Sequence, residues 1–275
     1  MQKATLFIVA TPIGNLEDMT YRAVRVLGEV DLIAAEDTRH SQVLLARYEI
    51  DTPLISVHEH NEDERIPALL QRLAQGQSIA LVSDAGTPLI SDPGFRLLRA
   101  AVDEGFSVIP VPGPSALTAA ISVAGLPPDR FSFEGFLPAK HASRLKRLER
   151  LSRECRTMIF FESNHRILAS LHDMRNVFGS DREVVLCREL TKKFETVLRG
   201  DLDLLITRLE QDESQTRGEC VVLIGGYPGD DTANEGHELA RALLEFLPAS
   251  QAARVAARVS GNSRRELYEG LKNLT

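Results

Sequence analysis

The sequence is poor in cysteine. Its 275 residues include three cysteines, Cys155, Cys187 and Cys220, which are widely spaced and lie in or beside apolar runs. Disulfide frameworks and zinc sites need several cysteines, or cysteines with histidines, at short and regular spacings. We therefore expect reduced cysteines that are buried as small apolar residues, with neither a disulfide nor a metal role.

Long hydrophobic runs are also absent. Met1-Gln2-Lys3 leads directly into the first apolar run, residues 5–10. Six residues are too few for a membrane span or for the apolar core of a signal peptide. This pattern predicts a cytoplasmic protein.

Nor is there an excess of positive charge, because 39 acidic residues outnumber 32 basic ones and give a net charge of −7. This balance argues against a protein that coats nucleic acid non-specifically, but it permits a local basic patch. Apolar residues make up 43% of the chain and charged residues 26%, as in an ordinary globular protein. The length is sufficient for two domains with a small appendage.

What the first part of the chain does contain is a regular alternation of short apolar runs and helical patterns. The spacing predicts helices at 21–30, 41–48, 64–75 and 93–104, between strands at 6–10, 32–35, 54–57, 79–82 and 108–111. The last helix has Asp92 as its expected N-cap, Pro93 at its first position and Gly105 just beyond its end. Such alternation indicates βαβ units and a mainly parallel sheet, whose ligands bind beyond the carboxyl ends of the strands.

A different sheet is predicted from about Pro112 onward. Residues 131–136 alternate at period two, which is typical of an antiparallel, half-exposed strand. Further strands are expected at 158–161, 184–187 and 220–225, with helices at 143–153, 165–177 and 202–210. We therefore divide the chain into an N-terminal α/β domain, 1–112, and a C-terminal α/β domain, 113–226.

The remainder reads as a polar linker, 227–236, and a helical tail, 237–275. Three short helices are expected in the tail, at 237–246, 250–259 and 264–271. Gly261 ends the second of them, and Ser263 with Glu266 forms a capping box at the start of the third. This arrangement predicts a helix-turn-helix-like unit, which either contacts RNA or caps the domain or a dimer.

The loops after the predicted strands are polar, yet they contain no Gly-x-Gly-x-x-Gly motif. The loop at 83–88 offers a carboxylate, a glycine and a proline, which let the backbone approach a ligand closely. Glu36, Asp37, Asp84 and Asp92 suit a cationic or polar ligand better than a dinucleotide. The alternative is that these acids are helix N-caps and first-turn charges.

Taken in order, the loops resemble one known family. The runs TPIGNL, AAEDTR, HEHNE, LVSDAGTPLISDPG, PVPGPSA, FEGFLPAK, IFFESNHR, CRELTK and RGE are similar to those of the tetrapyrrole methylase-like (class III) methyltransferases, from about residue 5 to the C-terminus. The resemblance implies two α/β domains with a cleft between them for S-adenosylmethionine, without a metal. Within the family it points to methylation of the ribose 2′-oxygen of a cytidine in 16S ribosomal RNA, in the decoding region of the small subunit, by a homodimer.

The resemblance also implies a donor site. The donor carries a sulfonium cation, an amino group and a carboxylate, so it needs oxygens and backbone contacts rather than a phosphate cradle. The segments that match the family's donor site supply Pro12, Gly14, Ser83, Asp84, Ala85, Gly86, Thr87, Pro88, Leu89, Pro112, Ser115, Phe161, Glu162, Gly218 and Glu219.

Methyl transfer requires mainly an aligned acceptor oxygen, helped by a base or by a cation near the developing alkoxide. Candidate catalytic residues are Glu36, Asp37, Glu189 and Lys192, with Arg39 and Arg188 as positioning residues. Lys192 could act as a base only if burial or a neighbouring cation lowered its pKa. The alternative for each is a structural ion pair at the cleft. His58 and His60 have no further ligand at plausible spacing, so a zinc site is disfavoured.

Two segments are candidates for RNA binding. Residues 139–156 carry many basic side chains in an otherwise acidic protein, and the tail carries more. The candidate residues are Arg39, Lys140, Arg144, Lys146, Arg147, Arg150, Arg264 and Arg265. The alternative for the first segment is a solvated helix face.

Two other functions stay open on the sequence alone. One is a methyltransferase of the same fold that acts on a tetrapyrrole, or on a protein in the manner of diphthine synthase. The other is a non-catalytic ligand sensor that binds nucleic acid through the tail. Production of adenosylhomocysteine would distinguish an enzyme from a sensor.

Overall fold

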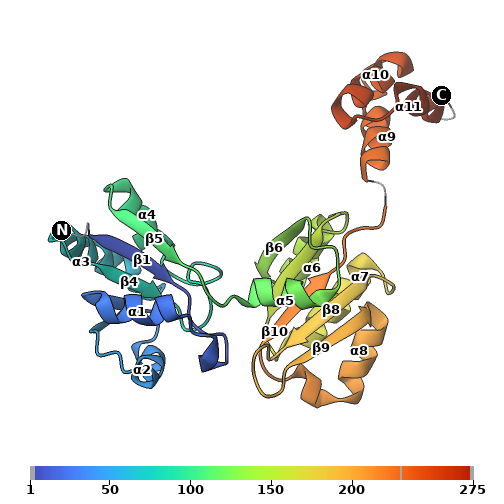
Figure 1. Ribbon diagram of the computed structural model, residues 1–275. Helices are drawn as coiled ribbons and strands as arrows, with labels where there is room; N and C mark the ends of the chain where they lie inside the picture. Colours follow the sequence, from blue (N-terminus) through green and yellow to red (C-terminus); the bar gives the residue numbers. More distant parts are fainter. Residues whose placement is uncertain (1–3, 230, 273–275) are drawn as a thin grey trace.

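The computed structural model describes residues 4–229 and 231–272. Two α/β domains lie side by side and a small helical tail extends from the second (Figure 1). Two sheets of five strands each form the centres of the two domains. None of the described helices is long and apolar enough to cross a membrane.

The first sheet is fully parallel and has the strand order β3-β2-β4-β1-β5. Its strands are β1 (Thr5–Val9), β2 (Leu32–Ala35), β3 (Leu54–Ser56), β4 (Ile79–Val82) and β5 (Ser107–Val111). The five predicted strands and their parallel arrangement are confirmed. The order reverses direction between β1 and β4, so the loops after these strands open a crevice at the sheet edge.

Helices cover both faces of this sheet. They are α1 (Tyr21–Glu29), α2 (Thr38–Arg47), α3 (Glu62–Ala74) and α4 (Phe95–Asp103), with a 3₁₀ turn at Leu16–Asp18. Ile33 and Ala35 of β2 face a core with α1 and α2, whereas Leu32 and Ala34 face a core with α3 and α4. Successive strand residues are therefore buried on opposite faces, which explains their continuous apolar runs.

The start of α4 differs from the prediction. The N-cap is Gly94, with φ of 111°, and the helix begins at Phe95 rather than at Pro93. A Cβ at Gly94 would lie 2.5 Å from Leu81 Cδ2, so only glycine fits where the chain passes over β4. Asp92, the expected N-cap, instead lines the pocket between the two domains.

The second sheet is mixed, with the order β6-β7-β10-β8-β9. Its strands are β6 (Phe131–Phe136), β7 (Thr157–Glu162), β8 (Glu183–Arg188), β9 (Thr196–Asp201) and β10 (Cys220–Ile224). The expectation of an antiparallel strand at 131–136 was wrong, because β6 pairs with β7 in parallel. Alternation of polar and apolar residues indicates that one face of a strand is exposed, and this also holds for an edge strand of a parallel pair. It does not indicate the direction of the neighbouring strand.

Helices α6 (His141–Arg150), α7 (Ile167–Phe178) and α8 (Leu202–Gln211) pack on one face of this sheet, around a core that includes Leu148, Leu171 and Leu205. The other face packs against α5 (Ala116–Ala124), an element that the sequence reading missed together with β9. A second 3₁₀ turn spans Glu213–Thr216. Ile13 of the first domain joins the α5 core and so ties the two domains together.

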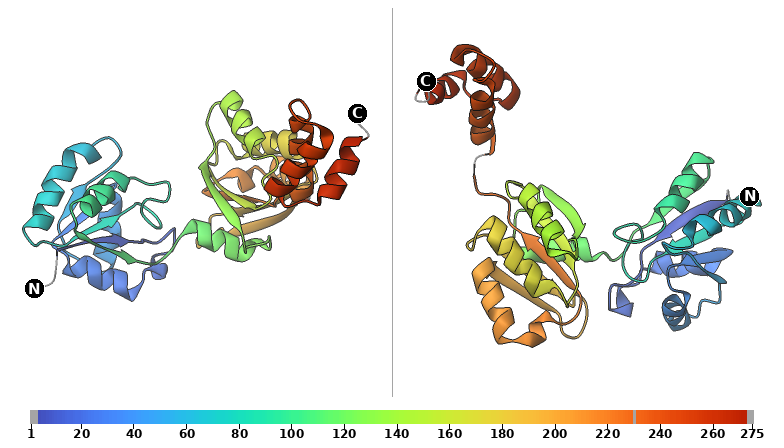
Figure 2. Two further views of the ribbon diagram at one scale, coloured as in Figure 1. Left: turned by 90° about the horizontal axis from the view of Figure 1, so that it is seen from above. Right: turned by 180° about the vertical axis from the view of Figure 1, so that it is seen from behind.

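The tail consists of α9 (Asp231–Leu243), α10 (Ala249–Ser260) and α11 (Arg264–Lys272). Three helices were predicted, but the first begins inside the segment expected to be a linker. Their own small core contains Ala240, Ala253 and Leu267. Figure 2 shows that the tail extends from the second domain. An ion pair of 2.7 Å joins Arg153, three residues beyond the end of α6, to Glu238 of α9.

The cysteines are all unpaired thiols. Cys187 and Cys220 are buried, as expected, but Cys155 is exposed, which the sequence reading did not anticipate. Burial raises the pKa of Cys187 to about 11 and that of Cys220 to about 12. Both buried thiols therefore stay neutral at physiological pH.

Candidate active site between the two domains

Three loops at the carboxyl edge of the first sheet are fastened to one another. The backbones of Thr11 and Gly86 exchange hydrogen bonds of 2.8 and 3.0 Å, which connect the loops after β1 and β4. The Thr11 hydroxyl also donates to the Ser83 carbonyl at 3.1 Å. The Thr87 hydroxyl donates to the Pro114 carbonyl at 3.1 Å and connects the loop after β5. These bonds fix one wall of the interdomain space.

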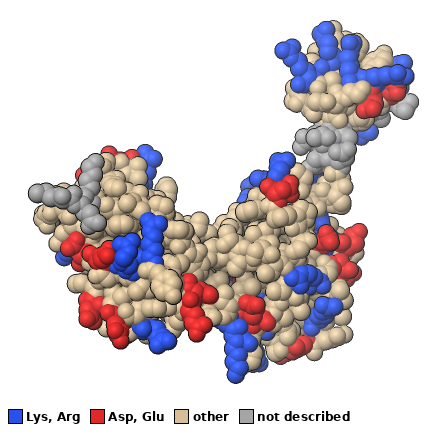
Figure 3. Space-filling model, viewed as in Figure 1, with Lys and Arg blue, Asp and Glu red and all other residues tan. Residues whose placement is uncertain are grey.

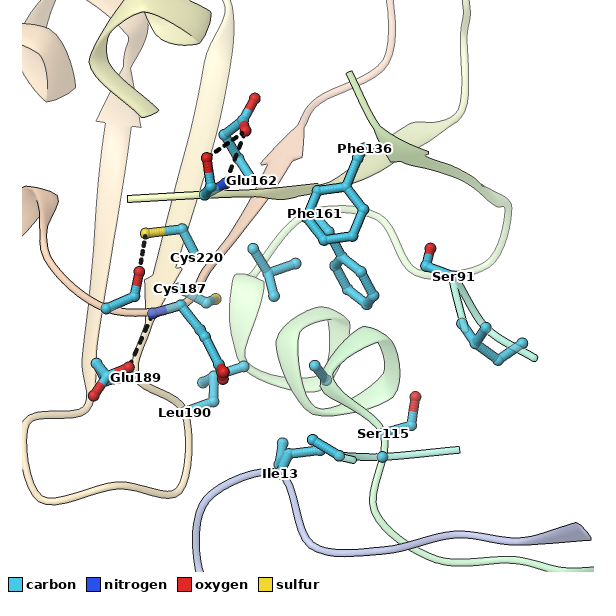
Figure 4. A pocket seen from close by; sticks show the side chains of 18 of the residues that line it. Ile13, Ser91, Ser115, Phe136, Phe161, Glu162, Cys187, Glu189, Leu190 and Cys220 are labelled. Atoms are coloured by element: carbon cyan, nitrogen blue, oxygen red, sulfur yellow. Dashed lines mark hydrogen bonds between the residues drawn. The ribbon is translucent and has the colours of Figure 1, made fainter. Parts of the chain in front are cut away.

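A pocket of about 620 Å³ lies between this wall and the strand ends of the second domain. Figure 4 shows Ser91 and Phe136 at one side of it and Glu189, Leu190 and Cys220 at the opposite side. Loops of both domains form it, so the pocket exists only when the domains are joined.

Eight of the expected donor residues line the pocket: Ala85, Gly86, Thr87, Ser115, Phe161, Glu162, Gly218 and Glu219. The other seven do not line it: Pro12, Gly14, Ser83, Asp84, Pro88, Leu89 and Pro112. Asp84, for example, accepts a hydrogen bond of 3.0 Å from the backbone N–H of Asp37 and so joins the loops after β4 and β2.

Sequence reasoning missed about half of the lining. Asp92 was expected among the acids suited to a ligand but was not assigned to the donor site. The residues that were not singled out for the site are Ile13, Ile90, Ser91, Ala116, Phe136, Ser163, Asn164, Cys187, Leu190, Cys220 and Val221. Most of these lie inside the quoted motifs, and Cys220 and Val221 directly follow one of them. The motifs therefore located the loops but not the side of each loop that faces the pocket. Leu89 and Ser91 have φ of 76° and 70°, a local twist that nothing in their residue types predicts.

Lys192 lies at one end of the pocket between two carboxylates. Its Nζ donates to Glu189 Oε1 and to Glu219 Oε2, both at 3.0 Å. Burial disfavours the charged ammonium, but the two carboxylates outweigh it and raise the pKa of Lys192. Burial likewise opposes the charge of Glu189, but the Glu219 N–H and Lys192 outweigh it and lower the pKa of Glu189. Lys192 is therefore a fixed cation and not a base.

Two glycines make room for this ion-pair cluster. A Cβ at Gly14 would lie 2.4 Å from Lys192 Cγ, and a Cβ at Gly218 would lie 2.5 Å from the Glu189 carboxyl carbon. Gly218 has φ of +90°, which favours glycine independently of the space. Gly14 therefore contributes by admitting the lysine stem from the other domain, although it does not line the pocket itself.

Glu36 and Asp37 do not line the pocket. Asp37 is the N-cap of α2 and accepts from the backbone N–H of Arg39 at 2.8 Å. The Arg39 guanidinium, aided by that N–H, lowers the pKa of Asp37 to about 2. Asp37 is thus a helix cap with an ion pair, as the alternative interpretation held, and such a weak base is poorly suited to catalysis.

Two further residues that were expected at the site make structural contacts within the second domain. Arg188 is buried, and it donates to the carbonyls of Arg217 and Phe194 at 3.2 and 3.0 Å. Glu162 is buried as well; it pairs with Arg166 at 2.7 Å and accepts from the Ser170 hydroxyl at 2.6 Å. Both side chains therefore hold loops of the second domain in place, and the Glu162 carboxylate is occupied by its own domain.

The acidic residues near β2 and β4 share a more unusual environment. Burial, and then the neighbouring Asp84 carboxylate, raise the pKa of Glu36. Burial raises the pKa of Asp92 to about 6, with further contributions from Glu36 and Asp84 against the hydrogen bond from Ser83. Asp92 is the member of this group that lines the pocket.

The histidine loop after β3 does not form a metal centre. The rings of His58 and His60 meet edge to face with centroids 6.0 Å apart. Glu62 is buried and accepts from the Leu97 backbone N–H at 2.9 Å. Within residues 4–229 and 231–272, no three histidine, cysteine or acidic side chains are grouped to hold a metal ion.

The basic segment around α6 divides into two sets. Arg144 is buried and donates to Asp173 at 2.6 Å, so the expectation that it contacts RNA was wrong. Arg147 pairs with Glu134 at 2.5 Å. Lys140, Lys146 and Arg150 are exposed on the surface.

Comparison with known proteins now defines the class. The family model for Tetrapyrrole (Corrin/Porphyrin) Methylases matches residues 5–206, and the model for the RsmI C-terminal HTH domain matches residues 230–271. The crystal structure of uroporphyrin-III C-methyltransferase from Thermus thermophilus with S-adenosylhomocysteine has the same fold, with a TM-score of 0.55 at 17% identity over 81% of this chain and 97% of that one. The chain belongs to the tetrapyrrole methylase family and is an S-adenosylmethionine-dependent methyltransferase.

Among curated proteins, the chain is similar to ribosomal RNA small subunit methyltransferase I. The protein of that name from Xylella fastidiosa (strain Temecula1) is 54% identical over 97% of this chain and 98% of its own length. The one from Pseudomonas aeruginosa is 53% identical over 98% and 97%. The helical tail is part of this likeness, since the matched lengths include it.

Proposed function

We propose that this protein transfers a methyl group from S-adenosylmethionine to the ribose 2′-oxygen of a cytidine in 16S ribosomal RNA, within the small ribosomal subunit. The observation that carries the proposal is the interdomain pocket. Backbone hydrogen bonds fix one of its walls, and polar and aromatic side chains line the rest. The near full-length similarity to ribosomal RNA small subunit methyltransferase I supports RNA over a tetrapyrrole or a protein as acceptor.

The acceptor is tested with small subunits from a strain that lacks the modification. We expect one methyl group per subunit on a cytidine 2′-oxygen. The position is read as resistance to alkaline cleavage, because that cleavage needs a free 2′-hydroxyl. A methyl group on a base, or methylation of a tetrapyrrole instead, would contradict the proposal.

We propose that the loop from Ser83 to Leu89 binds the donor, with Gly86 at the closest approach. Gly86 has φ of +83°, and a Cβ there would lie 3.3 Å from Ile13 Cγ2. Gly86→Val should therefore abolish donor binding in calorimetry while unfolding stays cooperative. The matched control is Gly76→Val, which has φ of +90° and no atom within 4 Å of the added Cβ. Equal donor affinity in the two variants would remove the loop from the site.

RNA binding is proposed for two exposed basic surfaces. The first consists of Lys140, Lys146 and Arg150. The second consists of Arg264 and Arg265 on the tail, where Figure 3 shows basic side chains gathered on the outer side. Each lost phosphate contact lowers the slope of log affinity against log salt by slightly less than one unit. Alanine at either set should flatten this slope and leave donor affinity unchanged, and Arg72→Ala on α3 serves as the control.

Three further properties are proposed on the family resemblance. The protein is a homodimer, which light scattering of the purified chain would test. It acts in the cytoplasm, where its ribosomal substrate is. The predicted domain limits are 1–112 and 113–226, followed by a linker at 227–236 and a tail at 237–275. Because α9 begins at Asp231, the linker is shorter than this prediction and ends before that residue.

A further inference from the structure

The two ends of the interdomain pocket differ in chemistry. At one end Lys192 forms ion pairs with Glu189 and Glu219 through hydrogen bonds of 3.0 Å. At the other end lie Ser91 and Phe136, and a Cβ at Gly135 of β6 would be 3.7 Å from Ser91 Oγ. Ile90 and Asp92, which also line the pocket, are the chain neighbours of Ser91. Figure 4 shows Ser91 and Phe136 together on the side away from Glu189.

The second end combines polar side chains with apolar ones that are open to solvent. Phe136 is 53% exposed and Ile90 is 39% exposed, although both line a pocket. The ring of Phe136 is held edge-to-face by Phe161, with centroids 5.7 Å apart. An exposed, supported aromatic ring is the usual platform on which an unpaired RNA base stacks. The ribose of a base stacked there would be at the same end of the pocket as Asp92.

Asp92 is half-buried and has no basic partner among the described residues. The Ser83 hydroxyl is the polar group that favours its carboxylate, and the charged groups that face it are the carboxylates of Glu36, on the loop after β2, and Asp84, on the loop after β4. His58, on the loop after β3, faces Glu36. Burial in this environment raises the pKa of Asp92 to about 6. A carboxylate with such a pKa is ionised at pH 7.5 and is a stronger proton acceptor than an ordinary aspartate.

The other acidic and basic candidates are less suited to accept a proton. Lys192 is held as an ammonium ion, and the pKa of Glu189 is lowered by the N–H groups that it accepts. Asp37 is an N-cap with a pKa of about 2. Glu36 is shifted in the same direction as Asp92 but does not line the pocket.

We infer that Asp92 is the general base of the reaction, at an acceptor end of the pocket where Phe136 stacks the target base. This inference rests on the proposed 2′-O-methylation. The 2′-hydroxyl gives its proton to the Asp92 carboxylate while its oxygen forms the new bond to the methyl carbon. The bond between sulfur and methyl breaks, and its electron pair stays on sulfur. The products are the 2′-O-methyl ribose, a neutral thioether and protonated Asp92, which then returns its proton to water.

The test compares Asp92→Asn with wild type in single-turnover methylation of small subunits between pH 5 and 9. The wild-type rate should rise with pH, with a midpoint near 6, and then level off. Asp92→Asn should lose this limb and react roughly 100-fold slower or more, as expected for removal of a general base. Donor and subunit affinities should stay within about twofold of wild type. Asp103→Asn, on the exposed face of α4, is the matched control.

A second variant makes the test independent of the behaviour of Asp92→Asn. Ser83→Ala removes the hydroxyl that favours the Asp92 carboxylate, so the midpoint of the rate limb should move to higher pH. A role of Asp92 in folding alone would not move this midpoint. Phe136→Ala should raise the KM for subunits by about tenfold with kcat nearly unchanged, and Phe136→Tyr should restore it.

Two outcomes would overturn the inference. One is an Asp92→Asn variant that keeps the wild-type rate and pH limb. The other is a Ser83→Ala variant whose midpoint does not move. The site of methylation by the wild-type protein is determined in the same samples. If that methyl is on a 2′-oxygen while either outcome holds, the base assignment alone fails; if it is elsewhere, the proposed function fails.

Discussion

Arg144 gives the sharpest test of how the basic segment is used. The sequence placed it among the RNA contacts, but its side chain is 7% exposed and donates at 2.6 Å to Asp173, which is 5% exposed. Arg144 also donates to the Ala139 carbonyl at 3.3 Å. The perturbation is Arg144→Met, which keeps much of the volume and removes the charge.

The magnitude follows from what the substitution leaves behind. Removing one partner of a buried ion pair typically costs about 3–5 kcal/mol, because the remaining charge stays buried. The His141 ring lies 3.1 Å from the same Asp173 oxygen and still supports it, so the lower part of that range applies. We expect a loss of about 3 kcal/mol in the free energy of unfolding, a large share of the total of about 5–15 kcal/mol for a domain.

Urea unfolding followed by circular dichroism measures this loss, and RNA binding is titrated against salt in parallel. Arg144→Met should lower the unfolding midpoint, while its RNA affinity at a temperature where it is folded should match wild type. Arg150→Met, exposed on the same helix, should unfold within about 0.5 kcal/mol of wild type. The reasoning is refuted if Arg144→Met keeps wild-type stability and instead binds RNA more weakly with a shallower salt dependence.

Three further changes have defined outcomes. Gly218→Ala would place a Cβ 2.5 Å from the Glu189 carboxyl carbon, at a backbone φ of +90°. Calorimetry should therefore record weaker donor binding, and the free energy of unfolding should fall by about 1–3 kcal/mol. Arg153→Ala removes the ion pair with Glu238, so limited proteolysis should cut the segment before the tail faster, with donor affinity unchanged. Asp92→Asn should stabilise the protein by about 1 kcal/mol at pH 8 and by nothing at pH 3, in paired unfolding curves.

The sign of the last effect follows from the direction of the shift. The pKa of Asp92 rises from 3.8 to about 6 on folding. The folded state therefore favours the protonated carboxyl, and this contribution is fully present below pH 3.8 and lost as the pH rises through 6. Asparagine imitates the protonated form at every pH. A two-unit shift on a fully buried group would correspond to about 3 kcal/mol, and exposure of the carboxyl to solvent reduces this to about 1 kcal/mol.

The sequence by itself determined the first sheet and the family. Apolar runs bounded by proline and glycine predicted all five parallel strands, because helices cover both faces of that sheet and every residue of the central strands β2 and β4 is buried. The ordered loop motifs pointed to the methyltransferase family, and they located the loops that line the pocket. Such features are local, so they can be read along the chain.

Only the tertiary structure decided which side chains share the pocket. Asp92 was predicted either as a helix cap or as an acid that faces a ligand, and the structure places it in the lining of the cleft, after the twist at Leu89 and Ser91. Arg144 was read as a surface charge, although Asp173, 29 positions away in sequence, holds it in the interior. The direction of β6 depended in the same way on its neighbour in the sheet. Pairings between residues distant in the sequence leave no trace in local periodicity, and they set the charge, exposure and pKa of the groups at this site.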